Sequence, residues 1–236
     1  MPNTWFQFKQ FKVEQEKTAM KVGTDGVLLG AWANINNAVD VLDIGTGTGL
    51  IALMLAQRQS IAQIDAVEID SDAYKQSQQN FFNSKWADRI KPYNIAIQDF
   101  HIDKKYDLIV SNPPYFKKSF LAKGAKRNLA RHNDSLSSKD LIESVLKLLK
   151  PKGVFSVILP FDNYEVFVKE MLFKNLYLNN ICNIYPTDNS IIKRVLLEFS
   201  FVQKARIEEG LIIEPQKRHV YSQEYINLTK DFYLNF

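Results

Sequence analysis

The sequence predicts an α/β fold in which helices cover both faces of a mostly parallel sheet. From residue 39 onward, short apolar runs alternate with helical patterns. This alternation is typical of parallel strands joined by covering helices. The last two apolar runs, at 177–184 and 194–201, have no helical pattern between them. They predict an antiparallel pair at one edge of the sheet.

The individual elements follow from the spacing of apolar residues. Continuous apolar runs are typical of strands buried on both faces, whereas apolar residues three or four apart indicate helices. Leu141, Val145 and Leu148 have the helical spacing, with Ser137 or Ser138 as the cap. The other expected strands are at 39–42, 64–69, 90–95, 106–110 and 154–159, and the other helices at 50–58, 72–84 and 164–174.

Two segments flank this unit. Phe6 and Phe8 alternate with polar residues and predict a short strand or hairpin. Near the other end, Tyr225, Leu228 and Phe232 form one stripe that is typical of core packing. A length of 236 residues suits one sizeable core. We therefore expect a single domain over residues 1–236, with residues 211–236 as a tail packed on it.

The composition excludes several classes of protein. Hydrophobic residues make up 46% of the chain and charged residues 24%, which excludes a disordered protein. One cysteine, Cys182, and three scattered histidines provide neither an internal disulfide nor a zinc site. The first twenty residues lack the apolar stretch of a secretory signal, and no run is long enough to span a membrane. We expect a cytoplasmic protein without metal, and a monomer by default.

Positive charge is concentrated in one segment. Residues 115–132 contain six of the 30 basic residues and no acidic residue, which leaves 24 basic against 26 acidic residues elsewhere. Such a segment predicts a polyanionic partner, although a solvated loop is the alternative. Its basic residues are Lys117, Lys118, Lys123, Lys126, Arg127 and Arg131.

A glycine-rich loop follows the first buried strand. Asp43 stands two residues before Gly45, and Gly47 and Gly49 complete the pattern D-x-G-x-G-x-G. Glycines allow close approach of the backbone to a ligand, and the following helix offers unpaired N–H groups. The loop resembles the first motif of class I S-adenosylmethionine methyltransferases, with another Rossmann enzyme or a degenerate loop as the alternatives. The resemblance implies that the loop binds the cofactor and that Asp43 helps to hold its methionine ammonium.

Carboxylates follow the next two strands. Glu68 ends the second strand, where a carboxylate accepts hydrogen bonds from both ribose hydroxyls. Asp99 follows the third strand and is expected to accept from the adenine amino group, with Ile69 and Phe100 packing on the ring. Asp70 is interpreted as a helix cap. A surface charge is the alternative for Glu68, and a loop acid for Asp99.

The fourth strand is followed by Asn112, Pro113, Pro114 and Tyr115. This stretch resembles the N-P-P-Y motif of methyltransferases that act on amino groups conjugated to a π-system. Two acceptors, the Asn112 side-chain oxygen and the Pro113 carbonyl, bind the amino hydrogens, and the prolines keep both oxygens aimed. Tyr115 offers a ring for stacking. Methylation at carbon 5 of a pyrimidine would need a cysteine nucleophile, and Cys182 lies far from every motif.

The whole chain resembles one family. With these motifs, the stretches 8–11, 19–32 and 225–234 resemble the bacterial methyltransferases that modify the adenine at position 37 of a valine tRNA. The resemblance implies a Rossmann-like sheet of seven strands with the last antiparallel. It implies that residues 1–35 cover the cofactor, with Lys21, Thr24 and Asp25 as candidate contacts. It also implies that the basic segment, joined by His132, contacts phosphates of the anticodon arm.

Other functions remain open. Ribosomal RNA or DNA could supply the amino group of adenine or guanine. A protein glutamine methyltransferase would place a substrate domain before the loop, and only 42 residues precede Asp43. An inactive RNA-binding module could lose Asp43, Glu68, Asp99 or Asn112 at little cost, and all four are present.

Overall fold

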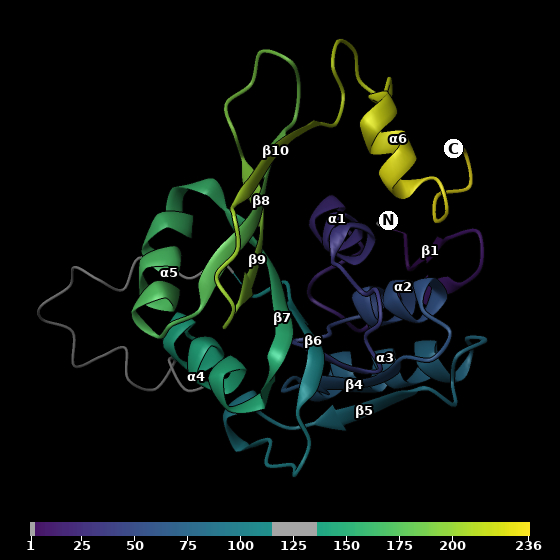
Figure 1. Ribbon diagram of the computed structural model, residues 1–236. Coiled ribbons are helices and arrows are strands. Elements are labelled where there is room, and N and C mark those ends of the chain that lie inside the picture. Colours follow the sequence, from purple (N-terminus) through teal and green to yellow (C-terminus); the bar gives the residue numbers. More distant parts are fainter. Residues whose placement is uncertain (1–2, 115–135) are drawn as a thin grey trace, which may run out of the picture.

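The computed structural model describes residues 3–114 and 136–236 of the chain. A twisted sheet of eight strands runs through these residues in the order β10-β8-β9-β7-β6-β3-β4-β5 (Figure 1). All neighbouring pairs are parallel except those that involve β9. The strands are β3 (Asp40–Ile44), β4 (Gln63–Glu68), β5 (Ile90–Asn94), β6 (Tyr106–Ser111), β7 (Leu149–Pro160), β8 (Tyr177–Tyr185), β9 (Arg194–Ser200) and β10 (Ile207–Ile212).

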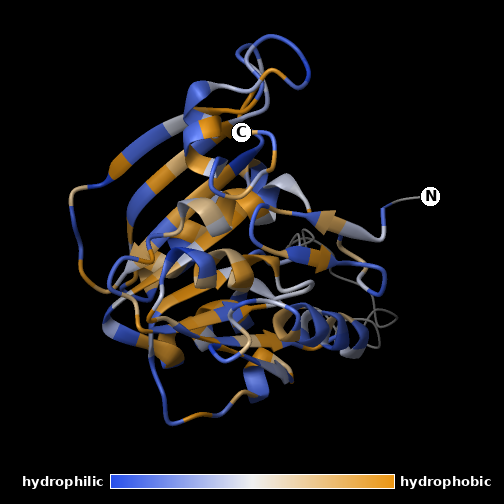
Figure 2. Ribbon diagram, turned by 90° about the vertical axis from the view of Figure 1, so that its right-hand side faces the viewer, coloured by the Kyte–Doolittle hydropathy of each residue, from blue (hydrophilic) through white to orange (hydrophobic). Residues whose placement is uncertain are grey.

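Helices cover both faces of this sheet. Side chains from α1, α2, α3 and α6 pack in one apolar core, and those from α4 and α5 pack in a second core on the opposite face. Figure 2 shows the central strands mostly in hydrophobic colours, as expected for strands buried on both sides. The helices are α1 (Thr24–Trp32), α2 (Leu50–Arg58), α3 (Ser71–Phe82), α4 (Ser138–Leu148), α5 (Phe161–Phe173) and α6 (Gln223–Thr229), with a 3-10 turn η1 at Ile97–Asp99.

The predicted fold class is confirmed, but the sheet has one strand more than the seven expected. The antiparallel strand of the expected seven is β9, which lies between β7 and β8 rather than at the edge. The additional strand, β10, is parallel to β8 and forms the edge. Its sequence, with Glu208, Glu209 and Gly210 at its centre, lacks an apolar run because edge residues are exposed to solvent.

Local signals for caps and burial are also confirmed. The Asp70 side chain accepts hydrogen bonds from the backbone N–H groups of Asp72 and Ala73 at the start of α3. The Ser137 hydroxyl accepts from Asp140 N–H at the start of α4. Cys182 lies in the core, and burial raises the pKa of its thiol to about 12. Such a thiol is a poor nucleophile.

The two ends of the described chain pack together. Residues 4–14 form the expected hairpin of β1 (Trp5–Gln7) and β2 (Lys12–Glu14). The Lys9 ammonium donates to the backbone oxygens of Lys230 and Phe236, each at 2.7 Å. The Phe8 ring stacks on Tyr233 with 5.9 Å between centroids. Tyr225 and Phe232 are buried in the same core, so the C-terminal segment covers the outer side of α1 and the hairpin.

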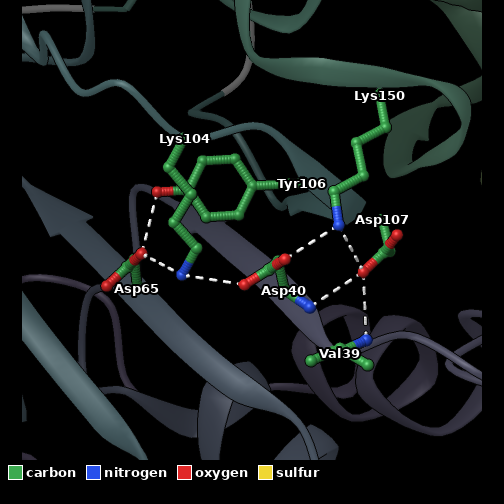
Figure 3. Close-up of polar contacts among 7 residues, drawn as sticks. All are labelled: Val39, Asp40, Asp65, Lys104, Tyr106, Asp107 and Lys150. Atoms are coloured by element: carbon green, nitrogen blue, oxygen red, sulfur yellow. Dashed lines mark hydrogen bonds and ion pairs between the residues drawn. The ribbon is translucent and has the colours of Figure 1, made fainter.

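A network of charges joins the strands near their amino ends (Figure 3). Lys104 pairs with Asp65 at 2.9 Å and with Asp40 at 3.2 Å. Lys150 pairs with Asp40 at 2.8 Å and with Asp107 at 3.0 Å. Although partial burial opposes it, pairing with these lysines lowers the pKa of Asp40. The network joins β3, β4, β6 and β7 at the edge opposite the glycine loop.

Candidate active site

The glycine loop connects β3 to α2 at the carboxyl edge of the sheet. Gly45, Gly47 and Gly49 have φ values of 72°, 56° and 84°, in the left-handed region that favours glycine. A Cβ atom on Gly49 would lie 2.4 Å from the Phe81 ring. At Gly45 and Gly47, a Cβ would meet no atom of the described residues within 4 Å. The loop therefore packs on α3 through Gly49 and leaves open space beside the other two glycines.

Asp43 lies directly beneath this loop and is fully buried. Its Oδ2 accepts a hydrogen bond from the Thr46 hydroxyl at 2.6 Å. Its Oδ1 has no partner among the described residues. Burial raises the pKa of Asp43 to about 7. An unpaired buried carboxylate oxygen is costly, and a ligand ammonium would satisfy it.

Glu68 ends β4, the neighbour of β3. Its Oε2 accepts from Gly47 N–H at 2.8 Å, and its Oε1 accepts from Asp70 N–H at 2.9 Å. These bonds fix the carboxylate against the glycine loop. A carboxylate has about four acceptor sites, so acceptor capacity for a diol remains.

The other expected adenosine contacts lie around the end of β5. Ile69 follows Glu68 and is 48% exposed. Asp99 is exposed at the end of η1. Phe100 is buried, with its ring edge-to-face on Tyr93 at 5.0 Å between centroids. The structure thus leaves Ile69 and Asp99 open to a ligand, whereas the Phe100 ring belongs to the core.

Asn112 and Pro113 follow β6 on the other side of β3. Ser111 is the register partner of Ile44, and its hydroxyl donates to the Ile44 carbonyl at 2.9 Å. Asn112 is therefore brought alongside the start of the glycine loop. Asn112 is half-buried, Pro113 is buried and Pro114 is exposed. Tyr115, His132 and the six expected phosphate contacts, Lys117, Lys118, Lys123, Lys126, Arg127 and Arg131, lie outside the described residues.

Of the three candidate contacts before the loop, Lys21 and Asp25 have other partners in this structure. The Lys21 ammonium donates to the Gln15 carbonyl. Thr24 is exposed at the first position of α1, whose N-cap is Gly23. Asp25, in the first turn of α1, pairs with Arg194 at 2.7 Å at the start of β9.

Sequence reasoning missed two residues that shape the loop. Thr46 holds Asp43, and Asn80 of α3 donates to the Thr48 carbonyl at 2.9 Å. A signal for Asn80 was present, because it follows Ala73 and Ser77 on the buried side of a helix. A polar residue in such a position is usually hydrogen-bonded to something specific.

The strand order places all these groups along one edge. From β5 to β6 the order is β5-β4-β3-β6, which brings Asp99, Glu68, Asp43 and Asn112 into one row. Neighbouring strands lie about 4.8 Å apart, so Glu68 and Asn112 lie roughly 10 Å apart across the sheet. The chain order reverses between β4 and β6 around β3, the position where open α/β sheets bind ligands.

This row fits S-adenosylmethionine. The orphaned Asp43 oxygen suits its ammonium, the open space at Gly45 and Gly47 admits a ligand against the backbone, and Glu68 has acceptors for a ribose. Among the described residues, no group of three or more His, Cys, Asp or Glu side chains is arranged to hold a metal ion. Nor does any helix of these residues have both the length and the apolar character needed to cross a bilayer.

Two solved methyltransferase structures have folds similar to this one. The structure matches a predicted O-methyltransferase from Agrobacterium tumefaciens with a TM-score of 0.69 at 16% identity, over 88% of this chain and 96% of that one. It matches a glycopeptide N-methyltransferase in complex with S-adenosyl-L-methionine with a TM-score of 0.55 at 13% identity, over 76% of this chain and 99% of that one. At these identities the likeness concerns the fold.

Sequence comparisons define the family. Residues 22–178 match the family model described as methyltransferase small domain. A tRNA1(Val) (adenine(37)-N6)-methyltransferase of Phocaeicola vulgatus is 51% identical over 100% of both chains. One of Flavobacterium psychrophilum is 49% identical over 97% of this chain and 99% of its own. The chain therefore belongs to the tRNA1(Val) (adenine(37)-N6)-methyltransferase family, whose fold is that of class I S-adenosylmethionine-dependent methyltransferases.

Proposed function

We propose that this protein transfers a methyl group from S-adenosylmethionine to the 6-amino group of adenine 37 in tRNA1(Val). The observation that carries the proposal is the full-length similarity to enzymes of that name, at 45–51% identity for the relatives cited here and one from Pseudoalteromonas translucida. The position of Asn112 in space, beside the start of the glycine loop, supports the same chemistry.

The cofactor half of the site comes from β3, β4 and the end of β5. S-adenosylmethionine supplies a methyl group on a positively charged sulfur. Asp43 holds the ammonium of its methionine part, and Glu68 accepts from its ribose hydroxyls. Gly45 and Gly47 let the backbone lie against the ligand, since no side chain of the described residues fills that space. Asp99 and Ile69 bind the adenine, with Phe100 supporting them from the core.

The target half of the site comes from the end of β6. The amino group of adenine is a weak nucleophile because its lone pair is delocalised into the ring. The Asn112 side-chain oxygen and the Pro113 carbonyl accept its two hydrogens and draw the lone pair out of conjugation. Positioning and fixed dipoles therefore carry the rate, and the product cation is acidic enough to need no strong base. Tyr115 stacks on the adenine, and Pro114 restricts the backbone between them.

The RNA contacts come from the basic segment that follows the target motif in the sequence. Lys117, Lys118, Lys123, Lys126, Arg127 and Arg131 bind phosphates of the anticodon arm, so that the target base is turned out of its stack into the pocket. Residues 1–35 cover the cofactor, with Lys21 and Thr24 as contacts. A tRNA substrate and a single buried cysteine support a cytoplasmic location. The monomer is kept as the default active unit.

A methylation assay with defined RNA tests the proposal. The purified protein, S-adenosylmethionine and a tRNA1(Val) transcript should yield N6-methyladenosine, measured by mass spectrometry of the digested nucleosides. The matched transcript with guanosine at position 37 should yield none. Ribosomal RNA, DNA and a glutamine-containing peptide test the alternative substrates. Methylation of one of these in place of tRNA, or equal methylation of both transcripts, would overturn the assignment.

A further inference from the structure

Buried amide side chains hold the segment 14–22 over α3 and the glycine loop. Gln15 is 5% exposed, Gln76 is 2% exposed and Asn80 is 1% exposed. The Gln15 Oε1 accepts from Val22 N–H at 2.7 Å, just before α1 begins. The Gln76 Oε1 accepts from Lys17 N–H at 3.2 Å. These amides thus fix a stretch of chain that has no regular secondary structure after Glu14.

Asn80 joins that stretch to the glycine loop. Its Oδ1 accepts from Glu14 N–H at 2.9 Å. Its Nδ2 donates to the Glu14 carbonyl at 2.8 Å and to the Thr48 carbonyl at 2.9 Å. Both amide hydrogens and one acceptor site are therefore used, which fixes the carboxamide plane.

The contact with Thr48 acts on the shape of the loop. The carbonyl of Thr48 and the N–H of Gly49 belong to one peptide plane. The Gly49 N–H donates to the Thr46 carbonyl at 2.8 Å, while Asn80 holds the other side of the plane. Thr46 in turn holds Asp43 through its hydroxyl. Displacing the Asn80 amide would free the peptide that closes the loop, and an unpaired buried carbonyl would remain.

We infer that Asn80 is a positioning residue that couples the segment 14–22 to the glycine loop, so that cofactor binding and the ordering of this segment favour each other. The inference rests on the proposed cofactor site at that loop. A residue that holds two backbone segments with one rigid amide transmits a change in either segment to the other. Coupling of this kind is reciprocal for binding free energies.

The test compares Asn80→Ala and Asn80→Asp with Gln79→Ala, a control at an exposed position of the same helix. Calorimetry with S-adenosylmethionine gives the Kd, and thermal melting without ligand reports folding. Asn80→Ala should raise the Kd about tenfold. Asn80→Asp keeps an acceptor for Glu14 N–H and loses both donors, so its Kd should rise as well. The control should keep the wild-type Kd.

Two further readouts separate positioning from mere stability. At saturating cofactor, kcat of Asn80→Ala should stay within about twofold of wild type, because the target half of the site is intact. In the wild type, S-adenosylmethionine should slow hydrogen exchange in the peptide 14–22, and this response should be lost in Asn80→Ala.

The outcomes are distinct. An unchanged Kd for S-adenosylmethionine in a cooperatively folded Asn80→Ala overturns the inference. So does a wild-type hydrogen-exchange rate at 14–22 that is the same with and without S-adenosylmethionine. The wild-type exchange measurement needs no variant, so it can overturn the inference even if both substitutions prevent folding. A wild-type protein that fails to bind S-adenosylmethionine would instead contradict the proposed function.

Discussion

Asp43 combines a structural cost with the binding role proposed for it. Its carboxylate is fully buried and one of its oxygens has no partner among the described residues, so burial raises its pKa to about 7. A carboxyl group whose folded pKa is raised favours folding when protonated. This group therefore makes the ligand-free protein more stable as the pH falls through 7 toward the unfolded value near 4.

Cofactor affinity should change in the opposite direction, because only the charged carboxylate attracts an ammonium. We expect the Kd for S-adenosylmethionine to rise by up to about tenfold per pH unit below 7. Calorimetry between pH 6 and 8 measures this. The matched variant Asp43→Asn should bind weakly with little dependence on pH. The same pH dependence in both proteins would show that another group titrates.

Asn112 should affect turnover rather than cofactor binding. The variant Asn112→Ala removes one of the two acceptors for the target amino group, so kcat should fall by about 100-fold or more. Its Kd for S-adenosylmethionine should stay near the wild-type value, since the proposed cofactor contacts lie on β3, β4 and the end of β5. Single-turnover kinetics and calorimetry test the two parts. Asn189→Ala, in the exposed turn after β8, is the control.

Equal losses in kcat and in cofactor affinity would contradict the role given to Asn112. They would mean that its side chain shapes the cofactor half of the site as well.

Individual elements differ in how well the sequence predicts them. The helix α2 lies at the expected residues 50–58, because its apolar residues and the preceding glycines mark both its face and its start. The strand β10 could not be predicted, since its pairing with β8 is decided by tertiary packing and its residues are mostly exposed. The strand β7 begins at Leu149, five residues before the expected start. Its first part is polar, and a shift in the pairing of β6 with β7 after Tyr106 keeps that part in the strand.

The candidate site likewise contains residues that the sequence predicts and residues that it does not. The carboxylates and the asparagine are expected at strand ends from sequence, and the parallel topology places those ends on one edge. The role of Thr46 and Asn80 depends on distances between loops that no local pattern encodes. The placement of Phe100 against Tyr93 is likewise a consequence of packing. Whether each predicted residue touches the cofactor stays a prediction.

The charge network joins four strands and should make the fold sensitive to acid. Pairing with Lys150 and Lys104 lowers the pKa of Asp40, against the effect of burial. Hydrogen bonds from the Asp40 backbone N–H and from Lys150 lower the pKa of Asp107, again against burial. A carboxyl group with a lowered folded pKa contributes stability above its unfolded value, near 3.9, and loses it as the pH falls through the folded value. The loss should therefore be confined to pH below about 4.

The variant Lys150→Met tests this contribution, because Lys150 pairs with both carboxylates. Its side chain is one-third exposed, so solvent screening limits the loss at pH 7 to about 1 kcal/mol of unfolding free energy. The difference from wild type should vanish below pH 4. Urea unfolding across this range measures it, with Lys152→Met, at an exposed position of the same strand, as control. A difference independent of pH would point to lost packing.

At the scale of the whole molecule, RNA affinity should depend on the basic segment at 115–132. The body of the protein carries 24 basic and 26 acidic residues, so it gives little attraction of its own. Neutralising Lys126, Arg127 and Arg131 together should weaken tRNA binding and reduce the slope of log K against log salt by about two to three. Filter binding at several salt concentrations tests this. An unchanged slope would show that phosphates are bound elsewhere.

Among the described residues, the open sheet leaves two rows of backbone groups without a neighbouring strand, and both are unsuited to recruiting another chain. On one side, β5 contains Pro92, which has no N–H to donate, next to Lys91. On the other, β10 presents the adjacent carboxylates of Glu208 and Glu209. Edge strands of this kind discourage the edge-to-edge pairing of sheets that leads to fibres. We therefore expect the sheet to stay unclosed, with the proposed ligand edge free, at little risk of aggregation.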